Sequence, residues 1–157
     1  MHYSENIAAC RLSPEAQIIV SKLRDTEMSK ALSMNPQLNS EAADNLLPMG
    51  RSIKMRALAF TSDLDSVKSA ILKNGLHAQY AARNVGLSPT FLSKCLKSSN
   101  DSVALSALIN RSTDREARES LSLEKIECLV NVGGVLANSV VRSFEVVLAN
   151  SWLRSEI

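Results

Sequence analysis

Polar and apolar residues follow one another along the chain with the three- and four-residue steps of short amphipathic α-helices. Three stretches open alike, with a leucine, a residue able to cap a helix and an early proline or glutamate: residues 12–25, 38–47 and 87–97. The expected caps are Ser13, Asn39 or Ser40, and Ser88. Proline suits the first helical position, where its missing N–H costs nothing. The pattern predicts a series of short capped helices.

These openings recur at a nearly constant interval. Leu12, Leu38, Leu64, Leu87 and Thr113 stand 26, 26, 23 and 26 residues apart, and the last opens a weaker signal with Thr113 or Ser112 as its cap. Such spacing suggests recurrent helix pairs and a short α-solenoid, although the short helices of any all-α protein come at similar intervals. In the first helix we expect Ile18, Ile19 and Leu23 to form the apolar face.

Residues 81–97, AARNVGLSPTFLSKCLK, have the pattern of a helix-turn-helix. Ala82 is small enough for a helix crossing, and Gly86 is expected to adopt the positive φ of the turn. The residues expected to face inward are Val85, Leu87, Leu92 and Cys95. The residues expected to face outward are Thr90, Ser93, Lys94 and Lys97, with Phe91 partly exposed. A helix over residues 64–75 would support the pair.

From Glu124 onwards the chain is apolar on more than one side. Small or apolar residues recur in steps of three and four at Leu129, Gly133, Leu136, Val140, Phe144, Val147 and Ser151, and further apolar residues lie off that stripe. This predicts one long helix, or two helices broken at Gly133 and Gly134. The segment would be a central core helix or a dimer interface, and we expect a homodimer formed through it.

Charge is concentrated in the middle of the chain. Residues 51–100 carry eight Lys or Arg against two Asp, a net charge of +6, while the segments on either side each carry −2. A basic segment of this kind is required for binding a polyanion, although solvated lysines on ordinary surfaces also produce it. If the partner is DNA, the base contacts expected are Thr90, Ser93 and Lys94, and the phosphate contacts are Arg83, Lys97, Lys68 and Lys73.

Neither catalysis nor metal binding is indicated. The three cysteines, Cys10, Cys95 and Cys128, lack metal-ligand spacing and are expected to be buried thiols of a reducing compartment, and His2 and His77 are isolated. There is no phosphate-binding glycine loop and no nucleophile motif. We therefore expect a cytoplasmic protein that is not an enzyme, has no cofactor or metal, and is not inserted in a membrane.

Residues 70–97 resemble the helix-turn-helix of bacterial transcription regulators. Residues 12–47 and 130–141 are similar, at few positions, to segments of the D subunit of the flagellar master activator, a helical dimer that joins a C subunit to activate promoters. The length departs from that family, and the four zinc-binding cysteines expected of the C subunit are absent. The resemblance implies a helical DNA-binding regulator that dimerises and can require a second protein subunit.

The sequence thus predicts an all-α protein, a compact multi-helix domain of short helices with a helix-turn-helix and a long C-terminal helix. Its expected parts are an N-terminal helical segment (1–62), the helix-turn-helix unit (63–100) and a C-terminal core or dimerisation segment (101–157), together forming one domain. The predicted function is a DNA-binding transcriptional regulator. The alternative is an α-helical, HEAT-like repeat module that binds another protein, such as an adaptor, immunity or anti-defence factor.

Overall fold

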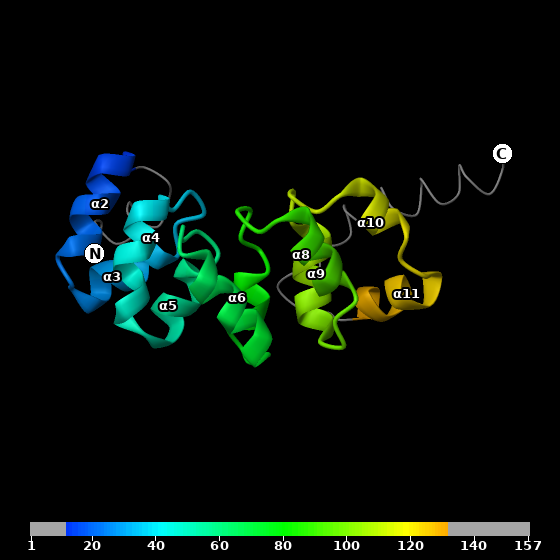
Figure 1. The fold of residues 1–157 in the computed structure, drawn as a ribbon. Helices are drawn as coiled ribbons and strands as arrows, with labels where there is room; N and C mark the ends of the chain where they lie inside the picture. Colours follow the sequence, from blue (N-terminus) through cyan, green and yellow to red (C-terminus); the bar gives the residue numbers. More distant parts are fainter. Residues whose placement is uncertain (1–11, 132–157) are drawn as a thin grey trace. The chain divides into compact units, whose positions relative to one another are not determined.

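The protein is all-α over residues 12–131, the part of the chain that the computed structural model describes (Figure 1). The elements are α2 (Pro14–Lys22), α3 (Thr26–Ser33), α4 (Ser40–Leu46), the 3₁₀ helix η1 (Leu47–Met49), α5 (Arg51–Ala57), α6 (Leu64–Lys73), α7 (Ala78–Ala81), α8 (Pro89–Leu96), α9 (Asp101–Ile109), α10 (Arg115–Glu119) and α11 (Leu123–Asn131). The predicted fold class is confirmed. The long C-terminal helix and its dimer interface were predicted mostly from residues 132–157, which lie outside the described residues.

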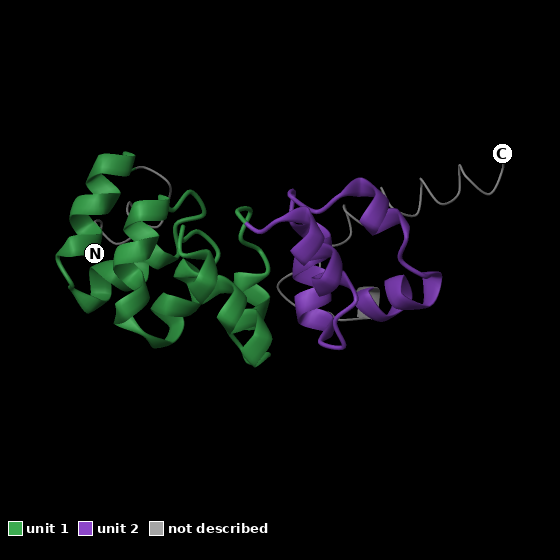
Figure 2. Ribbon diagram, viewed as in Figure 1, with its two compact units in different colours: residues 1–86 green, residues 87–157 purple. Residues whose placement is uncertain are grey.

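The chain divides into two compact units, residues 1–86 and 87–157 (Figure 2). In unit 1 the helices form pairs, α2 with α3, α4 with α5 and α6 with α7. Successive pairs are stacked, because α2 packs on α4, α3 on α5 and α5 on α7. In unit 2, α8 pairs with α9, and these two helices pack on α10 and α11 respectively. The helix pairs therefore recur at the interval that the leucine spacing predicted.

Side-chain caps begin most of these helices. Ser13 accepts from the N–H of Ala16 at 3.2 Å, and Asn39 accepts from Glu41 at 2.9 Å. Both were predicted caps. Two helices begin with caps that are less obvious in the sequence, Asp25 for α3 and Asp63 for α6. Each cap satisfies an N–H group that has no partner within the helix.

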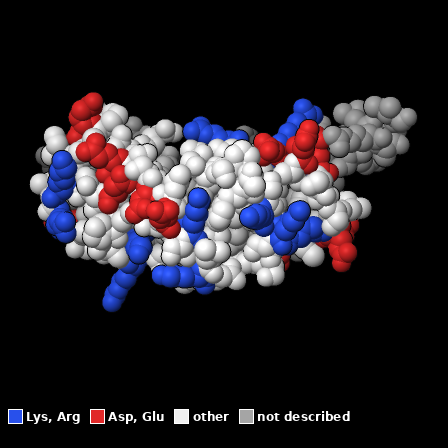
Figure 3. Space-filling view, viewed as in Figure 1, with Lys and Arg blue, Asp and Glu red and all other residues white. Residues whose placement is uncertain are grey.

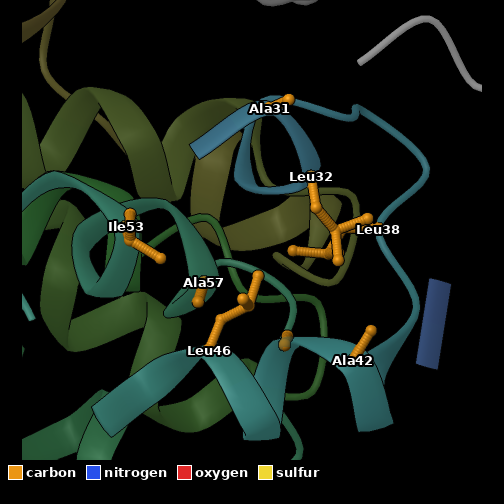
Figure 4. Packing of buried hydrophobic residues seen from close by; sticks show 8 residues of the cluster. Ala31, Leu32, Leu38, Ala42, Leu46, Ile53 and Ala57 are labelled. Carbon is orange, nitrogen blue, oxygen red and sulfur yellow. The ribbon is translucent and has the colours of Figure 1, made fainter. Parts of the chain in front are cut away.

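The core of unit 1 is formed by small and branched residues of three consecutive helices (Figure 4). Its buried members are Ala31, Leu32, Leu38, Ala42, Ala43, Leu46, Ile53 and Ala57. In Figure 4, Leu46 of α4 and Ala57 of α5 lie beside each other, close to Leu32 and Leu38. Alanines at this interface let the short helices approach closely, and the leucines fill the remaining space.

Four buried polar residues recur at the same interval as the helix pairs. Each stands three residues before the opening of the next pair: Asn35 before Leu38, Thr61 before Leu64, Asn84 before Leu87 and Asn110 before Thr113. None of the four is more than 3% exposed. Each side-chain oxygen accepts from the backbone N–H two residues later, at 2.8, 3.1, 2.9 and 2.9 Å respectively. The repeat is thus defined by a buried turn as well as by a leucine.

The predicted apolar face of α2 is wrong for two of its three residues, since Ile18 packs against the core of unit 1 but Ile19 and Leu23 do not. Ile19 is 63% exposed and Leu23 is 57% exposed, whereas Gln17 is buried. The side-chain amide of Gln17 donates to the carbonyl of Gln37 at 3.3 Å and accepts from the N–H of Asn39 at 2.8 Å. The two fully buried residues of α2, Gln17 and Ser21, are polar, and Gln17 satisfies the backbone of the turn that leads into α4.

The cap predicted at residue 113 or 112 is also wrong. The N-cap of α10 is Asp114, one residue further along the chain. Thr113 is buried, and its hydroxyl donates to the carbonyl oxygen of Ala107 at 2.5 Å. The Thr113 hydroxyl thus joins the N–H of Asn110 on the carbonyl of Ala107, at the end of α9, and does not cap the first turn of α10.

Candidate nucleic-acid interface

Helix α8 begins as predicted. The backbone of Ser88 is extended, its hydroxyl oxygen accepts from the N–H of Phe91 at 3.2 Å, and Pro89 occupies the first helical position. The inward face carries Leu92, Cys95 and Leu96, none more than 5% exposed. Burial raises the pKa of the Cys95 thiol, so this cysteine is a neutral core residue. The sequence pattern correctly placed Leu92 and Cys95 inside.

The outward face of α8 carries a hydroxyl and two cations. Thr90, Lys94 and Lys97 are exposed, at positions spaced by four and three residues. Neither lysine forms an ion pair with any residue between 12 and 131. Figure 3 shows basic side chains over α8 and α9 on the visible face of unit 2. Ser93 is half-buried, and its hydroxyl donates to the carbonyl of Pro89 at 2.9 Å, so its proton is already used within the helix.

Helix α9 supports α8 from behind. Residues 103–108 of α9 are all 1% exposed or less, so this helix is buried on every side. Its N-cap, Asn100, accepts from the N–H of Ser102 at 3.0 Å. The ammonium of Lys125 on α11 donates to the carbonyl of Ser98 at 2.9 Å and pairs with Asp101 at 3.3 Å. The position of α8 is therefore fixed by its partners within unit 2.

The remaining predicted phosphate contacts belong to unit 1. Lys68 and Lys73 are on α6, where Lys68 is half-buried and Lys73 is exposed. Arg83 follows α7 and is half-buried, with its guanidinium carbon 4.9 Å from the centre of the Tyr80 ring. Burial lowers the pKa of Arg83, and Tyr80 partly opposes that shift. The candidate site residues thus form two groups, three in unit 1 and four in unit 2.

The helix-turn-helix prediction joined α7 to α8, but the two helices have their main packing partners in different units. α7 packs on α6 and α5, and α8 packs on α9 and α10. The boundary between the units falls between Gly86 and Leu87, inside the predicted turn. Ala82 and Leu87 are buried as expected, at 0% and 2% exposure. The structural support of α8 therefore comes from the helix that follows it in the chain.

The role predicted for Gly86 is wrong, and so is the burial predicted for Val85. The φ angle of Gly86 is not in the positive region, and Val85 is 45% exposed. A Cβ atom at residue 86 would lie 3.1 Å from Oδ1 of Asn84 and 3.1 Å from Cδ2 of Leu64. Glycine is needed here because the neighbouring side chains approach the backbone closely, and not because of an unusual dihedral angle.

Asn84 is the important residue of this turn that the sequence analysis missed. Its amide nitrogen donates to the carbonyl of Leu58 at 2.9 Å and to that of Thr61 at 2.8 Å, while its oxygen accepts from Gly86 at 2.9 Å. The sequence did hold a signal, because a polar residue stands three positions before each opening residue from Leu38 to Thr113.

Other kinds of site find no support in the described part of the chain. Between residues 12 and 131, no group of three or more His, Cys, Asp or Glu side chains could hold a metal ion. None of the helices in the same range is long and apolar enough to cross a membrane. No protein-family model, curated protein or solved structure matches this chain.

Proposed function

We propose that the protein binds DNA through the outward face of α8 and acts as a transcriptional regulator. The observation that carries the proposal is the pair Lys94 and Lys97, exposed and free of ion pairs within the described residues, beside the exposed hydroxyl of Thr90. The opposite face of the same helix is anchored by Leu92 and by Leu96. A helix held from behind can enter the major groove without losing its own packing.

The chemistry assigned to each residue follows from its exposure. Lys97 contacts a phosphate oxygen, as the sequence predicted, and we assign Lys94 to a phosphate as well, in place of the base contact predicted for it. Thr90, in the first turn, is the residue best placed to contact a base edge. Ser93 can only accept a hydrogen bond from DNA while its hydroxyl donates to the carbonyl of Pro89. The unit 1 residues Lys68, Lys73 and Arg83, and a homodimer through the C-terminal segment, remain predictions that this proposal does not require.

The experiment compares two double variants of the full chain by fluorescence anisotropy with genomic DNA fragments over a range of salt concentrations. Lys94→Ala with Lys97→Ala is expected to weaken binding and to lower the log–log salt slope by roughly 1.8, about 0.9 for each phosphate contact removed. Both residues are exposed, so the free energy of unfolding should change by less than about 0.5 kcal/mol.

The matched control is Lys30→Ala with Lys54→Ala, which removes two lysines of unit 1 that are also exposed. This variant should bind DNA like the unchanged protein. Equal losses in the two double variants would mean that binding responds to net charge alone, and unchanged affinity in the α8 variant would rule out α8 as the DNA-binding element.

A second candidate is an α-helical repeat module that binds another protein. The specific observation in its favour is the recurrence of the same helix pair with the same buried turn at Asn35, Thr61, Asn84 and Asn110. Stacked helix pairs build extended surfaces of the kind used to bind proteins. The salt titration separates the two candidates, because a protein-binding repeat has no DNA affinity that falls steeply with salt.

A further inference from the structure

The connections between the two helices of each pair in unit 1 share a backbone feature. Each contains a residue with positive φ: Arg24 at 55° between α2 and α3, Gly50 at 73° and Arg51 at 50° between α4 and α5, and Asn74 at 54° between α6 and α7. α2 packs on α4 and α3 packs on α5, and in Figure 1 the turn from α2 to α3 lies at the lower left of unit 1 and the turn from α4 to α5 lies at its lower margin. Figure 1 shows α4, α5 and α6 with their lower ends along one margin of the unit. We call residues 22–24, 49–51 and 72–76 the connection edge.

The connection edge is basic. Its exposed cations are Lys22, Arg24, Arg51 and Lys73, and none of them forms an ion pair with a described residue. Two carboxylates, Asp25 and Glu27, stand beside it at the start of α3, where Asp25 caps the helix by accepting from Met28 at 2.9 Å. In Figure 3 basic side chains lie along the lower margin below α5 and α6, whereas acidic side chains lie over the opposite ends of α2 and α4.

Helix dipoles account for part of this charge pattern but not for the leucines. Acidic residues at helix N-termini and basic residues at C-termini each stabilise the helix that carries them. Three of the seven exposed large apolar side chains between residues 12 and 131 also lie on this edge: Leu23 at 57%, and Leu72 and Leu76, the two most exposed, at 78% and 79%. A leucine gains nothing from a helix dipole, and its exposure to water at a loop is unfavourable in the free chain. Several such leucines among cations indicate a binding surface.

We propose that the connection edge binds an acidic amphipathic segment of a partner protein. The carboxylates of such a segment pair with Lys22, Arg24, Arg51 and Lys73, and its apolar side chains cover Leu23, Leu72 and Leu76. A nucleic acid satisfies the cations but offers little to aliphatic leucines at loop tips, so the two features together favour a protein. The edge lies within unit 1 and α8 lies within unit 2, so this proposal does not depend on the DNA-binding proposal.

The test uses a phage-displayed library of random 16-residue peptides selected against the folded full-length chain. Enriched peptides should be acidic and rich in leucine or other large apolar residues. One such peptide, synthesised with a fluorescent label, is then titrated with variants of the full chain. Leu72→Ser with Leu76→Ser, and separately Lys22→Glu with Lys73→Glu, should each weaken peptide binding at least tenfold.

Matched controls remove the same kinds of side chain from other exposed positions. Ile19→Ser with Met34→Ser replaces two exposed apolar residues of unit 1 outside the edge, and Lys30→Glu with Arg111→Glu reverses two exposed cations elsewhere. Both controls should bind the peptide within twofold of the unchanged chain. Thermal melts of all variants establish that each is folded.

Three outcomes overturn the proposal. One is the absence of acidic, apolar peptides after selection. Another is equal weakening by the edge variants and by their controls. The third is a loss of DNA affinity in Lys22→Glu with Lys73→Glu while peptide binding is unchanged, which would assign the edge to nucleic acid. The Lys94→Ala with Lys97→Ala variant reports on α8 alone, so failure of DNA binding there leaves this test intact.

Discussion

At the scale of single residues, the recurrent turn depends on one side chain in each repeat. Asn84 satisfies three backbone groups from different parts of unit 1: the carbonyls of Leu58 and Thr61 and the N–H of Gly86. The hydroxyl of Thr61 also donates to Oδ1 of Asp44 at 2.5 Å, which ties α4 to the same network. Buried backbone groups without partners are costly, so these polar residues stabilise the stack although they add no apolar contact.

Replacing Asn84 tests this argument. Asn84→Ala leaves two carbonyls and one N–H without their protein partner, and we expect a loss of roughly 2–4 kcal/mol in the free energy of unfolding, measured by urea denaturation. Asn84→Asp has the same shape and keeps the acceptor for Gly86, but it cannot donate to the two carbonyls, so it should also be destabilising. Thr90→Ala, at an exposed position, is the control with little expected effect. A loss at residue 84 no larger than this control would contradict the role given to the turn.

Gly86 provides a second test at the same scale. If glycine is needed here because neighbouring side chains approach closely, an added Cβ atom should be destabilising. Gly86→Ala is expected to lower the free energy of unfolding by about 1–3 kcal/mol, since the new Cβ would lie 3.1 Å from Asn84 and from Leu64. Gly75→Ala is the control, because no atom lies within 4 Å of its Cβ position and its φ is not positive. It should be neutral or stabilising, by about 0.4–1 kcal/mol. Equal behaviour of the two alanines in urea denaturation would refute the close-contact explanation.

At the scale of elements, the sequence was most informative about features that depend on near neighbours. The caps Ser13, Asn39 and Ser88 were predictable because each acts on an N–H two or three residues away. The inward and outward faces of α8 were predictable because its pattern is strongly amphipathic. The buried face of α2 was not, since Gln17 is fixed by a backbone N–H 22 residues later in the sequence, at Asn39. A helical period reports apolar burial and misses a face that is buried for its hydrogen bonds.

Helix α9 allows a prediction that belongs to this scale. Its residues 103–108 are buried, and the hydroxyl oxygen of Ser106, a residue that is 0% exposed, has no hydrogen-bond partner. Ser106→Ala removes that unpaired group and favours the helix, so the free energy of unfolding should rise by about 1 kcal/mol in urea denaturation. Ser102→Ala in the same helix serves as the control for helix propensity. A destabilising effect of Ser106→Ala would contradict the prediction, because it would mean that the hydroxyl of Ser106 forms a stabilising interaction.

At the scale of the whole molecule, the interval of 26, 26, 23 and 26 residues was the most reliable guide to the fold, because it reports the helix pair as the unit of construction. The division of these pairs into two compact units at Gly86 and Leu87 was not predictable. In the sequence, the charges and turn residues of residues 81–97 form one continuous motif. No local feature indicates that the helix before Gly86 and the helix after it pack in different units. The candidate DNA-binding residues were therefore predicted as one set, while the structure assigns them to two units.

The two units predict a modular response to core substitution. Leu105 of α9 and Leu46 of α4 are both 0% exposed, and replacing either with alanine is expected to cost about 2–5 kcal/mol. In helical arrays each repeat is stabilised mainly by its nearest neighbours, so the loss should remain within the unit that carries the cavity. Hydrogen exchange measured by mass spectrometry should show faster exchange across residues 87–131 in Leu105→Ala, with residues 12–57 unchanged, and the reverse pattern in Leu46→Ala. If either substitution accelerates exchange equally in both regions, the units unfold together and the chain behaves as one cooperative domain, as its length alone suggested.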